Sequence, residues 1–205
     1  MNISENYLKI TSPETGTSYG GSQSWFPLLS MKKGGCGIIA AADMLLYLKG
    51  VRELSLNDYL RFADRIKKYF LTMGPLGMHG LALASGLNKA FKANKMKYKA
   101  KWVMNPSRLK SSAEKMISQG IPVIFSIGPD FPITLLSASL DLYSKTYEGS
   151  FNKTSKARKH FMMLTGFQGE MASVSSWGRK YYIKWDEFEK IACTRSRFLT
   201  SILLI

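Results

Sequence analysis

The sequence of 205 residues contains only two cysteines and two histidines, the side chains best suited to nucleophilic attack and proton transfer near neutral pH. Cys36 follows Gly34-Gly35 and begins an apolar run, whereas Cys193 lies in an amphipathic run near the C-terminus. A thiol in the first turn of a buried helix receives the helix dipole and nearby backbone N–H groups, which favour the thiolate. Cys36 equally fits a small apolar residue that caps a core helix. The choice between a nucleophile and a core residue therefore depends on whether a general base accompanies this cysteine.

The glycines around Cys36 suit the same chemistry. Gly34, Gly35 and Gly37 let the chain turn sharply and let a substrate carbonyl approach the backbone. The backbone N–H of Cys36 could then donate a hydrogen bond to an oxyanion.

The candidate general base is His160. It begins the strand-like run HFMMLTGF directly after a basic polar segment, which would put its ring at a strand edge facing a cleft. His79 lies in the glycine-rich segment GPLGMHG, with no strand and no orienting group beside it. The sequence therefore favours His160 as the partner of Cys36.

The first half of the chain has helical patterns. Cys36–Leu48 is apolar on nearly every side and is followed by Gly50 as a C-cap, which predicts a central buried helix. Ser55 opens a second helix, and a third runs from about Leu81 to Ala93. A fourth begins at the capping pair Asn105-Pro106 and ends at Gly120.

From Ile121 the pattern changes to short runs rich in β-forming residues: IPVIFSIG, HFMMLTGF, MASVSSW, KYYIKW and FLTSILLI. Asp186–Cys193 predicts a short helix, and Lys153–Lys159 predicts a loop. LLSASLDLY, within residues 133–147, fits either period. Helices followed by an antiparallel sheet indicate an α+β domain with segregated layers.

The length predicts one domain. We expect an irregular N-terminal segment over about residues 1–33, a helical lobe over 34–120 and a β lobe over 121–205.

The order of these features resembles the papain-like cysteine peptidase superfamily. Its compact bacterial group, related to the double-glycine leader peptidases of bacteriocin exporters, is most similar in length and spacing. The matching features are Cys36 with Gly37 and an alanine-rich helix, His160 with its apolar strand, and Ser175-Ser176-Trp177-Gly178. In papain the corresponding string is Asn-Ser-Trp-Gly. The resemblance implies that Ser175 orients the imidazole and that Trp177 screens this contact from water.

The resemblance spans about residues 22–205 and departs from the family pattern at two positions. Ser175 replaces Asn or Asp, and a hydroxyl carries no charge to stabilise imidazolium. The family's oxyanion-hole glutamine lies six residues before the nucleophile, where this chain has Ser30, and the nearest glutamine is Gln23. Either Gln23 reaches in from a longer loop, or Ser30 and backbone groups bind the oxyanion, or the site has lost hydrolysis.

The resemblance implies a cysteine peptidase or amide hydrolase that acts on a peptide or protein substrate without a cofactor. Cys36 would attack the carbonyl, and His160 would protonate the leaving amine and then activate water. Asp141 and Glu170 are weaker candidates than Ser175 for the partner of His160, because neither lies at the family spacing. Two alternatives remain: a catalytically inactive papain-like peptide-binding protein, and a basic nucleic-acid-binding domain with Cys36 in its core.

The formal net charge of +15 will attract polyanions whatever the function. Lys95, Lys97, Lys99 and Lys101 alternate with less polar residues up to Trp102, which predicts an amphipathic strand with its lysines in water. No zinc-finger or RNA-binding signature accompanies them, so no specific nucleic acid is predicted. A cleft lined by this lysine-rich face would favour acidic or polyanionic substrates.

The sequence also argues against a zinc site, a phosphate-binding loop, a disulfide and a membrane-spanning segment. The cysteines and histidines lack the paired spacing of a zinc site, and GGCG lacks the lysine of a phosphate-binding loop. The unlike surroundings of Cys36 and Cys193 argue against a disulfide. No export signal and no run of about 18 apolar residues occurs, so we expect a soluble, cytoplasmic protein whose oligomeric state is left open.

Overall fold

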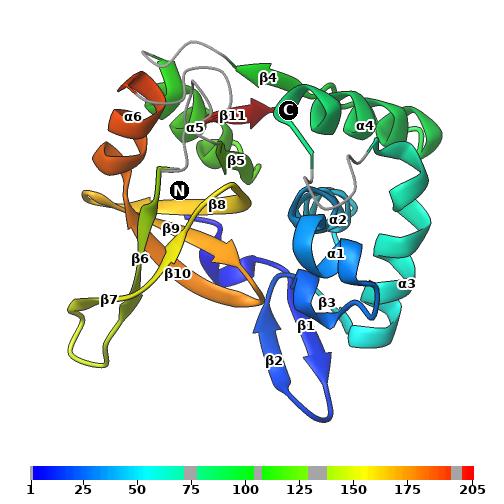
Figure 1. The fold of residues 1–205 in the computed structure, drawn as a ribbon, viewed down its shortest axis with the longest axis horizontal. Helices are drawn as coiled ribbons and strands as arrows, with labels where there is room; N and C mark the ends of the chain where they lie inside the picture. Colours follow the sequence, from blue (N-terminus) through cyan, green and yellow to red (C-terminus); the bar gives the residue numbers. More distant parts are fainter. Residues whose placement is uncertain (1, 72–77, 104–107, 129–137, 195–199) are drawn as a thin grey trace.

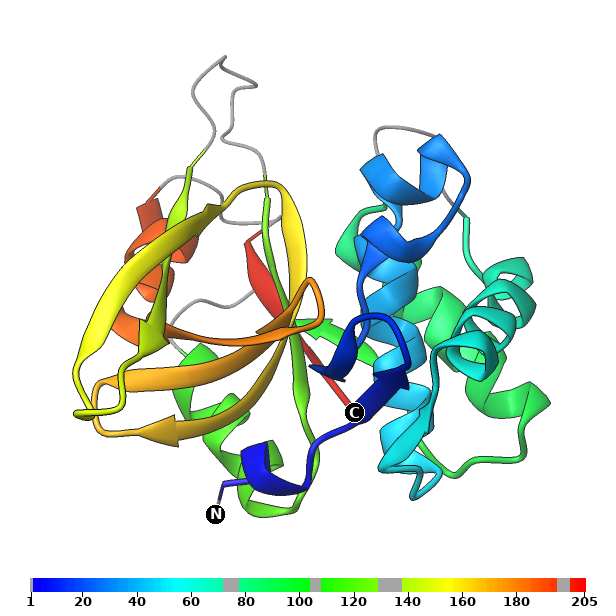
Figure 2. The ribbon, with the colours of Figure 1, turned by 90° about the horizontal axis from the view of Figure 1, so that it is seen from below.

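The computed structural model describes residues 2–71, 78–103, 108–128, 138–194 and 200–205. It has a mixed α+β architecture in which a helical lobe and a sheet lobe pack side by side (Figure 2). The helical lobe contains α1 (Leu29–Gly34), α2 (Cys36–Leu48), α3 (Leu56–Ile66) and α4 (Gly80–Ala93). The sheet lobe carries α5 (Leu109–Ser118) and α6 (Trp185–Thr194).

The sheet lobe is built on an eight-stranded sheet whose neighbouring strands are all antiparallel (Figure 1). In spatial order its strands are β4 (Lys101–Val103), β11 (Ser201–Leu204), β5 (Val123–Ile127), β8 (His160–Gln168), β9 (Met171–Ser176), β10 (Arg179–Lys184), β6 (Leu140–Lys145) and β7 (Phe151–Ala157). The fully buried strands β5 and β9 and the almost fully buried β8 lie at its centre. A buried apolar run of this kind holds a residue at its end in a fixed position, and His160 is the first residue of β8.

A second, three-stranded sheet has the order β2 (Gly16–Tyr19), β1 (Lys9–Ser12), β3 (Glu53–Ser55). The prediction that residues 1–33 are irregular is therefore wrong, since this segment contains β1, β2 and α1. These strands are short and half-exposed, so they lack the apolar alternation by which strands are recognised in a sequence.

The central buried helix predicted from the sequence is α2. Every residue from Cys36 to Tyr47 is buried, and the helix packs against α3, α4 and β8. Its end is set by Gly50, which has φ +79° and whose N–H donates to the Tyr47 carbonyl at 3.0 Å. Because α2 contacts β8, this helix lies at the boundary between the two lobes (Figure 1).

The second and third predicted helices are α3 and α4. Ser55 caps α3 as predicted, because its hydroxyl accepts from the Asp58 N–H at 3.1 Å. The fourth predicted helix is α5, but it packs against β5, β8 and β11 and so belongs to the sheet lobe and not to the helical lobe. Its predicted cap, Asn105-Pro106, lies outside the described residues.

Two basic stretches differ from prediction. Lys153–Lys159 was predicted as a loop, but Phe151–Ala157 forms the edge strand β7, whose polar residues face solvent. Edge strands commonly carry lysine, because charge discourages pairing with other chains. Conversely, the strand predicted over Lys95–Trp102 is regular only in β4, although all four lysines are exposed as predicted.

Two general features of the described chain complete the fold. Neither Cys36, which is buried, nor Cys193, which is exposed, is in a disulfide. Across the described ranges, no helix has both the length and the apolar character needed to cross a membrane.

Candidate active site

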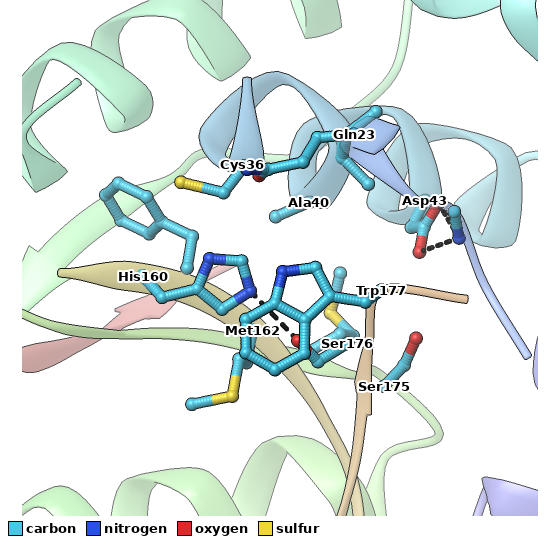
Figure 3. A pocket seen from close by; sticks show the side chains of 13 residues that line it. Gln23, Cys36, Ala40, Asp43, His160, Met162, Ser175, Ser176 and Trp177 are labelled. Carbon is cyan, nitrogen blue, oxygen red and sulfur yellow. Dashed lines mark hydrogen bonds between the residues drawn. The ribbon is translucent and has the colours of Figure 1, made fainter. Parts of the chain in front are cut away.

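Cys36 and His160 line one cavity at the boundary between the lobes (Figure 3). Cys36 is the first residue of α2, and His160 is the first residue of β8. Both are nearly closed off from solvent, with exposed fractions of 9% and 7%. The two residues selected from the sequence as nucleophile and base therefore line the same cavity, although 124 positions separate them.

The imidazole of His160 is held at one nitrogen. Its Nε2 lies 2.9 Å from the hydroxyl oxygen of Ser176, while the other ring nitrogen is directed toward Cys36 (Figure 3). When Nε2 carries the proton and donates it to Ser176, Nδ1 is left as the acceptor. This tautomer is the one that a general base facing Cys36 requires.

The prediction that Ser175 holds the imidazole is wrong. The Ser175 hydroxyl donates to the Tyr19 carbonyl at 2.8 Å, on the other side of the strand from His160. Successive residues of a strand point to opposite faces, so only one of the two adjacent serines can reach the ring. The dipeptide Ser175-Ser176 left this choice open in the sequence, and the pairing of β9 with β8 decides it in favour of Ser176.

Trp177 covers the face of the His160 imidazole. The two rings stack with centroids 4.6 Å apart and an interplanar angle of 19°. Trp177 has φ +50° and Gly178 has φ +74°, which together form the two-residue turn between β9 and β10. A left-handed conformation at a tryptophan costs about 1–3 kcal/mol, so the surrounding contacts must hold it there.

The contacts that hold this turn come from residues 19–21. The Gly178 N–H donates to the Gly21 carbonyl at 2.9 Å, and the Gly178 carbonyl accepts from the Tyr19 N–H at 2.8 Å. A Cβ atom at Gly178 would lie only 3.0 Å from the Trp25 ring. The position of Trp177 over His160 thus depends on the N-terminal segment as well as on the hairpin.

Gly21 is held in turn by Asp43, a carboxylate buried in the middle of α2. Asp43 accepts from the Gly21 N–H at 3.1 and 3.2 Å, from the Tyr59 hydroxyl at 2.7 Å and from the Tyr7 hydroxyl at 3.1 Å. Burial raises the pKa of Asp43 to about 6, although these hydrogen bonds act in the opposite direction. Asp43 is the one charged residue in the apolar stretch 36–48, and this isolated charge is the signal in the sequence for the network.

The electrostatics of the closed site favour neutral groups. Burial lowers the pKa of His160 to about 4. Burial also raises the pKa of the Cys36 thiol, and backbone hydrogen bonds from Phe161, Gly37 and Cys36 itself offset part of this effect. The resting site therefore holds a thiol and an imidazole at pH 7, not a thiolate and an imidazolium.

The two candidates for the oxyanion hole have different positions. Gln23 lines the cavity, and its side chain runs along α2 toward Cys36 (Figure 3). Its Nε2 donates to the Lys32 carbonyl at 2.6 Å, and its Oε1 is buried without a partner. Ser30 is exposed on α1 and does not line the cavity, so the suggestion that it serves the site is wrong. Gly37 lies beside Phe161 and Met78, where a Cβ would meet atoms at 3.4 Å.

The remaining candidates of the sequence lie elsewhere. His79 caps α4, because its Nδ1 accepts from the Ala82 N–H at 3.2 Å. Asp141 forms ion pairs with Lys153 and Lys156 on the β6–β7 hairpin, and Glu170 is exposed in the turn between β8 and β9. Within the described ranges, no cluster of three or more His, Cys, Asp or Glu side chains could hold a metal ion.

The arrangement combines a thiol at a helix N-terminus, an imidazole positioned by a hydroxyl, and an aromatic ring that excludes water. These parts suit nucleophilic attack by sulfur with proton transfer to nitrogen. No family model, curated protein or solved structure matches this chain, so the interpretation of the site rests on its own geometry.

Proposed function

We propose that the protein is a papain-like cysteine hydrolase that cleaves an amide or peptide bond. The observation that carries the proposal is the placement of His160, with one ring nitrogen fixed by Ser176 and the other directed at Cys36. A histidine that merely filled the core would need no such orientation toward a thiol. The cover provided by Trp177 adds the exclusion of water that strengthens polar interactions at a reacting centre.

The first chemical step follows from the neutral state of the pair. The Cys36 sulfur attacks the substrate carbonyl carbon while His160 Nδ1 takes the thiol proton, so the pair becomes charged only as the reaction proceeds. The carbonyl oxygen becomes an oxyanion. The backbone N–H of Cys36 and the second N–H of the Gln23 amide are the donors proposed to stabilise it.

The second step releases the amine and then restores the enzyme. Imidazolium at His160 gives its proton to the leaving nitrogen, the carbon–nitrogen bond breaks, and an acyl thioester remains on Cys36. His160 then takes a proton from water, whose oxygen attacks the thioester. The carboxylic acid product leaves, and the thiol is regenerated with that proton.

The test uses p-nitrophenyl acetate, a small activated ester that acylates nucleophilic thiols. We expect mass spectrometry of the intact chain and its peptides to show acetylation at Cys36 faster than at the exposed Cys193, which serves as the internal reference. His160→Ala should slow acetylation of Cys36 by roughly 10²–10⁴-fold, the range for loss of a positioned general base. The Cys193 rate should not change.

The opposite result would be equally clear. Acetylation of Cys36 that is no faster than that of Cys193, and that is the same in His160→Ala, would refute the hydrolase. The Cys36→Ser variant controls for acetylation at other nucleophiles, because any signal that remains in it does not come from this thiol.

A second candidate function is peptide binding without cleavage. Two observations favour it: the raised pKa of the Cys36 thiol, and a serine in place of a charged or amide partner for His160. Slow acetylation of Cys36, together with protection of this thiol from iodoacetamide by a bound peptide, would support the binding protein over the enzyme.

A further inference from the structure

Five exposed basic residues lie on the three chain segments that form the candidate site. Lys32 and Lys33 are on α1, Arg158 and Lys159 form the turn from β7 into β8, and Arg179 is the first residue of β10. We refer to these five residues as the basic rim. In Figure 1 the turn into β8 lies across from α1 and the start of α2, so the rim has members on both lobes.

Each part of the basic rim is linked to a residue of the site. The Lys32 carbonyl accepts the hydrogen bond from Gln23 Nε2 at 2.6 Å. Lys159 directly precedes His160 and has φ +44°, in the sharp turn that leads into β8. Arg179 is paired across the β9–β10 hairpin with Ser176, the residue that holds the imidazole. Every residue of the rim therefore lies within four positions of Cys36, His160 or Ser176 in the sequence.

The stretches of sequence that carry the basic rim are free of acidic residues. Residues 15–42, 149–169 and 171–185 contain no aspartate or glutamate. In the part of the chain that the structure describes, none of the five forms an ion pair, whereas Lys153, Lys180 and Lys184 all do. Among the described residues, Asp43 is the one carboxyl group that lines the cavity, and it is buried among its own hydrogen bonds.

Cations close to a low-dielectric cavity produce a positive potential there, which raises the local concentration of anions. A peptide with carboxylates on either side of its reacting bond would meet cations on both lobes. A neutral peptide would gain nothing from them, and a basic peptide would be repelled. Neither the basic rim nor the lysine-rich stretch over residues 95–101, suggested by the sequence as the source of such a preference, contributes a side chain to the lining of the cavity. The rim differs from that stretch because its residues are close in the sequence to Cys36, His160 and Ser176.

We propose that the peptide recognised at Cys36 is acidic, with aspartate or glutamate side chains flanking the bond that is cut. This inference rests on the proposed function for its cleavage step. The recognition itself depends only on the charges of the basic rim.

The potential at Cys36 can be measured with two alkylating agents of similar size, iodoacetate and iodoacetamide, which differ by one negative charge. The quantity of interest is the ratio of their alkylation rates at Cys36. The rim variant is Lys32→Glu/Lys33→Glu, and the matched control is Lys89→Glu/Lys92→Glu on α4, which has the same change in net charge at exposed positions.

We expect the ratio of iodoacetate to iodoacetamide rates at Cys36 to fall about fivefold or more in the rim variant at low salt, and to stay within about twofold of wild type in the control. The difference should shrink at high salt. An unchanged ratio in the rim variant, or an equal fall in both variants, would overturn the inference.

A second measurement tests the peptide directly through protection of Cys36 from iodoacetamide. An octapeptide of alternating Glu and Gly should protect at a lower concentration than its Gln-Gly counterpart, and the rim variant should lose this difference. Equal protection by both peptides, or better protection by a single-stranded oligonucleotide, would contradict an acidic peptide as the partner.

Failure of this inference can be told from failure of the proposed function. If Cys36 is acetylated in a His160-dependent way but ignores the rim charges, the hydrolase stands and the acidic substrate is refuted. If the rim controls both the ratio and the protection while acetylation is absent, the acidic peptide is a ligand and the hydrolase is refuted.

Discussion

Two buried groups of the site should make opposite contributions to the pH dependence of stability. Asp43 has a pKa of about 6 in the folded protein against an ordinary value of 3.8, so the folded state holds its proton more tightly. Its contribution to stability is present below pH 3.8 and is lost as the pH rises through 6. His160 has a pKa of about 4 against an ordinary 6.5, so its contribution is present above pH 6.5 and is lost as the pH falls through 4.

The two contributions are of similar size. For each group the difference of about 2 pH units between the folded and the ordinary pKa corresponds to about 3 kcal/mol. Because they have opposite signs over almost the same range, they should largely cancel in the wild-type protein between pH 4 and 6. Replacing one group alone should make the contribution of the other group visible in the pH dependence of stability.

The perturbations are Asp43→Asn and His160→Gln, and the assay is urea unfolding followed by tryptophan fluorescence from pH 4 to 7. The free energy of unfolding of wild type minus that of Asp43→Asn should fall by about 3 kcal/mol as the pH rises. The corresponding difference for His160→Gln should rise by about 3 kcal/mol. Subtracting each variant from wild type removes the titration of all other carboxylates.

Asp64→Asn is the matched control, since Asp64 is exposed on α3. Its difference from wild type should be flat across the same range. A flat or rising difference for Asp43→Asn would refute the reasoning, because it would mean that the hydrogen bonds to Asp43 outweigh its burial and keep the carboxylate ionised in the folded protein.

Two further predictions concern the contacts of the imidazole. Trp177→Ala should expose His160 to water and raise its pKa from about 4 toward 6.5, measured by NMR titration of the ring protons; an unchanged pKa would mean that Trp177 does not screen the ring. Ser176→Ala should slow acetylation of Cys36 by roughly 10–100-fold, whereas Ser175→Ala should keep the rate and lower the free energy of unfolding by about 1 kcal/mol. The reverse order of the two serines would refute the assignment.

Most of the elements could be predicted because their local patterns are strong. The continuous apolar run after Cys36 identified α2. Short runs rich in β-forming residues identified β8, which begins at His160, and β9, which ends directly before Trp177. The strands that were missed, β1, β2, β3 and β7, are mostly polar and partly exposed. These segments are strands because they pair with neighbouring strands, and their own sequences do not show this pairing.

The candidate site, too, could be predicted only in part from the sequence. Cys36 and His160 could be selected by residue type, since the chain has so few thiols and imidazoles. The choice of Ser176 over Ser175 depends on the register in which β9 pairs with β8. A shift of this register by one residue would exchange the two serines, and the sequence does not fix it that closely. The link from Asp43 to Gly21 joins positions 22 residues apart through tertiary packing, and no local pattern predicts it.

The passage of residues 20 and 21 between Asp43 and its neighbours sets a limit on how this protein can vary. A side chain at Gly20 would overlap the carboxylate of Asp43 and the hydroxyl of Ser175, and one at Gly21 would overlap the hydroxyl of Tyr59. Gly20 also has φ +73°. Substitutions here should be among the least tolerated in the chain. Homologous chains that keep the packing around Asp43 should therefore keep both glycines, even where the nucleophile and base have been lost.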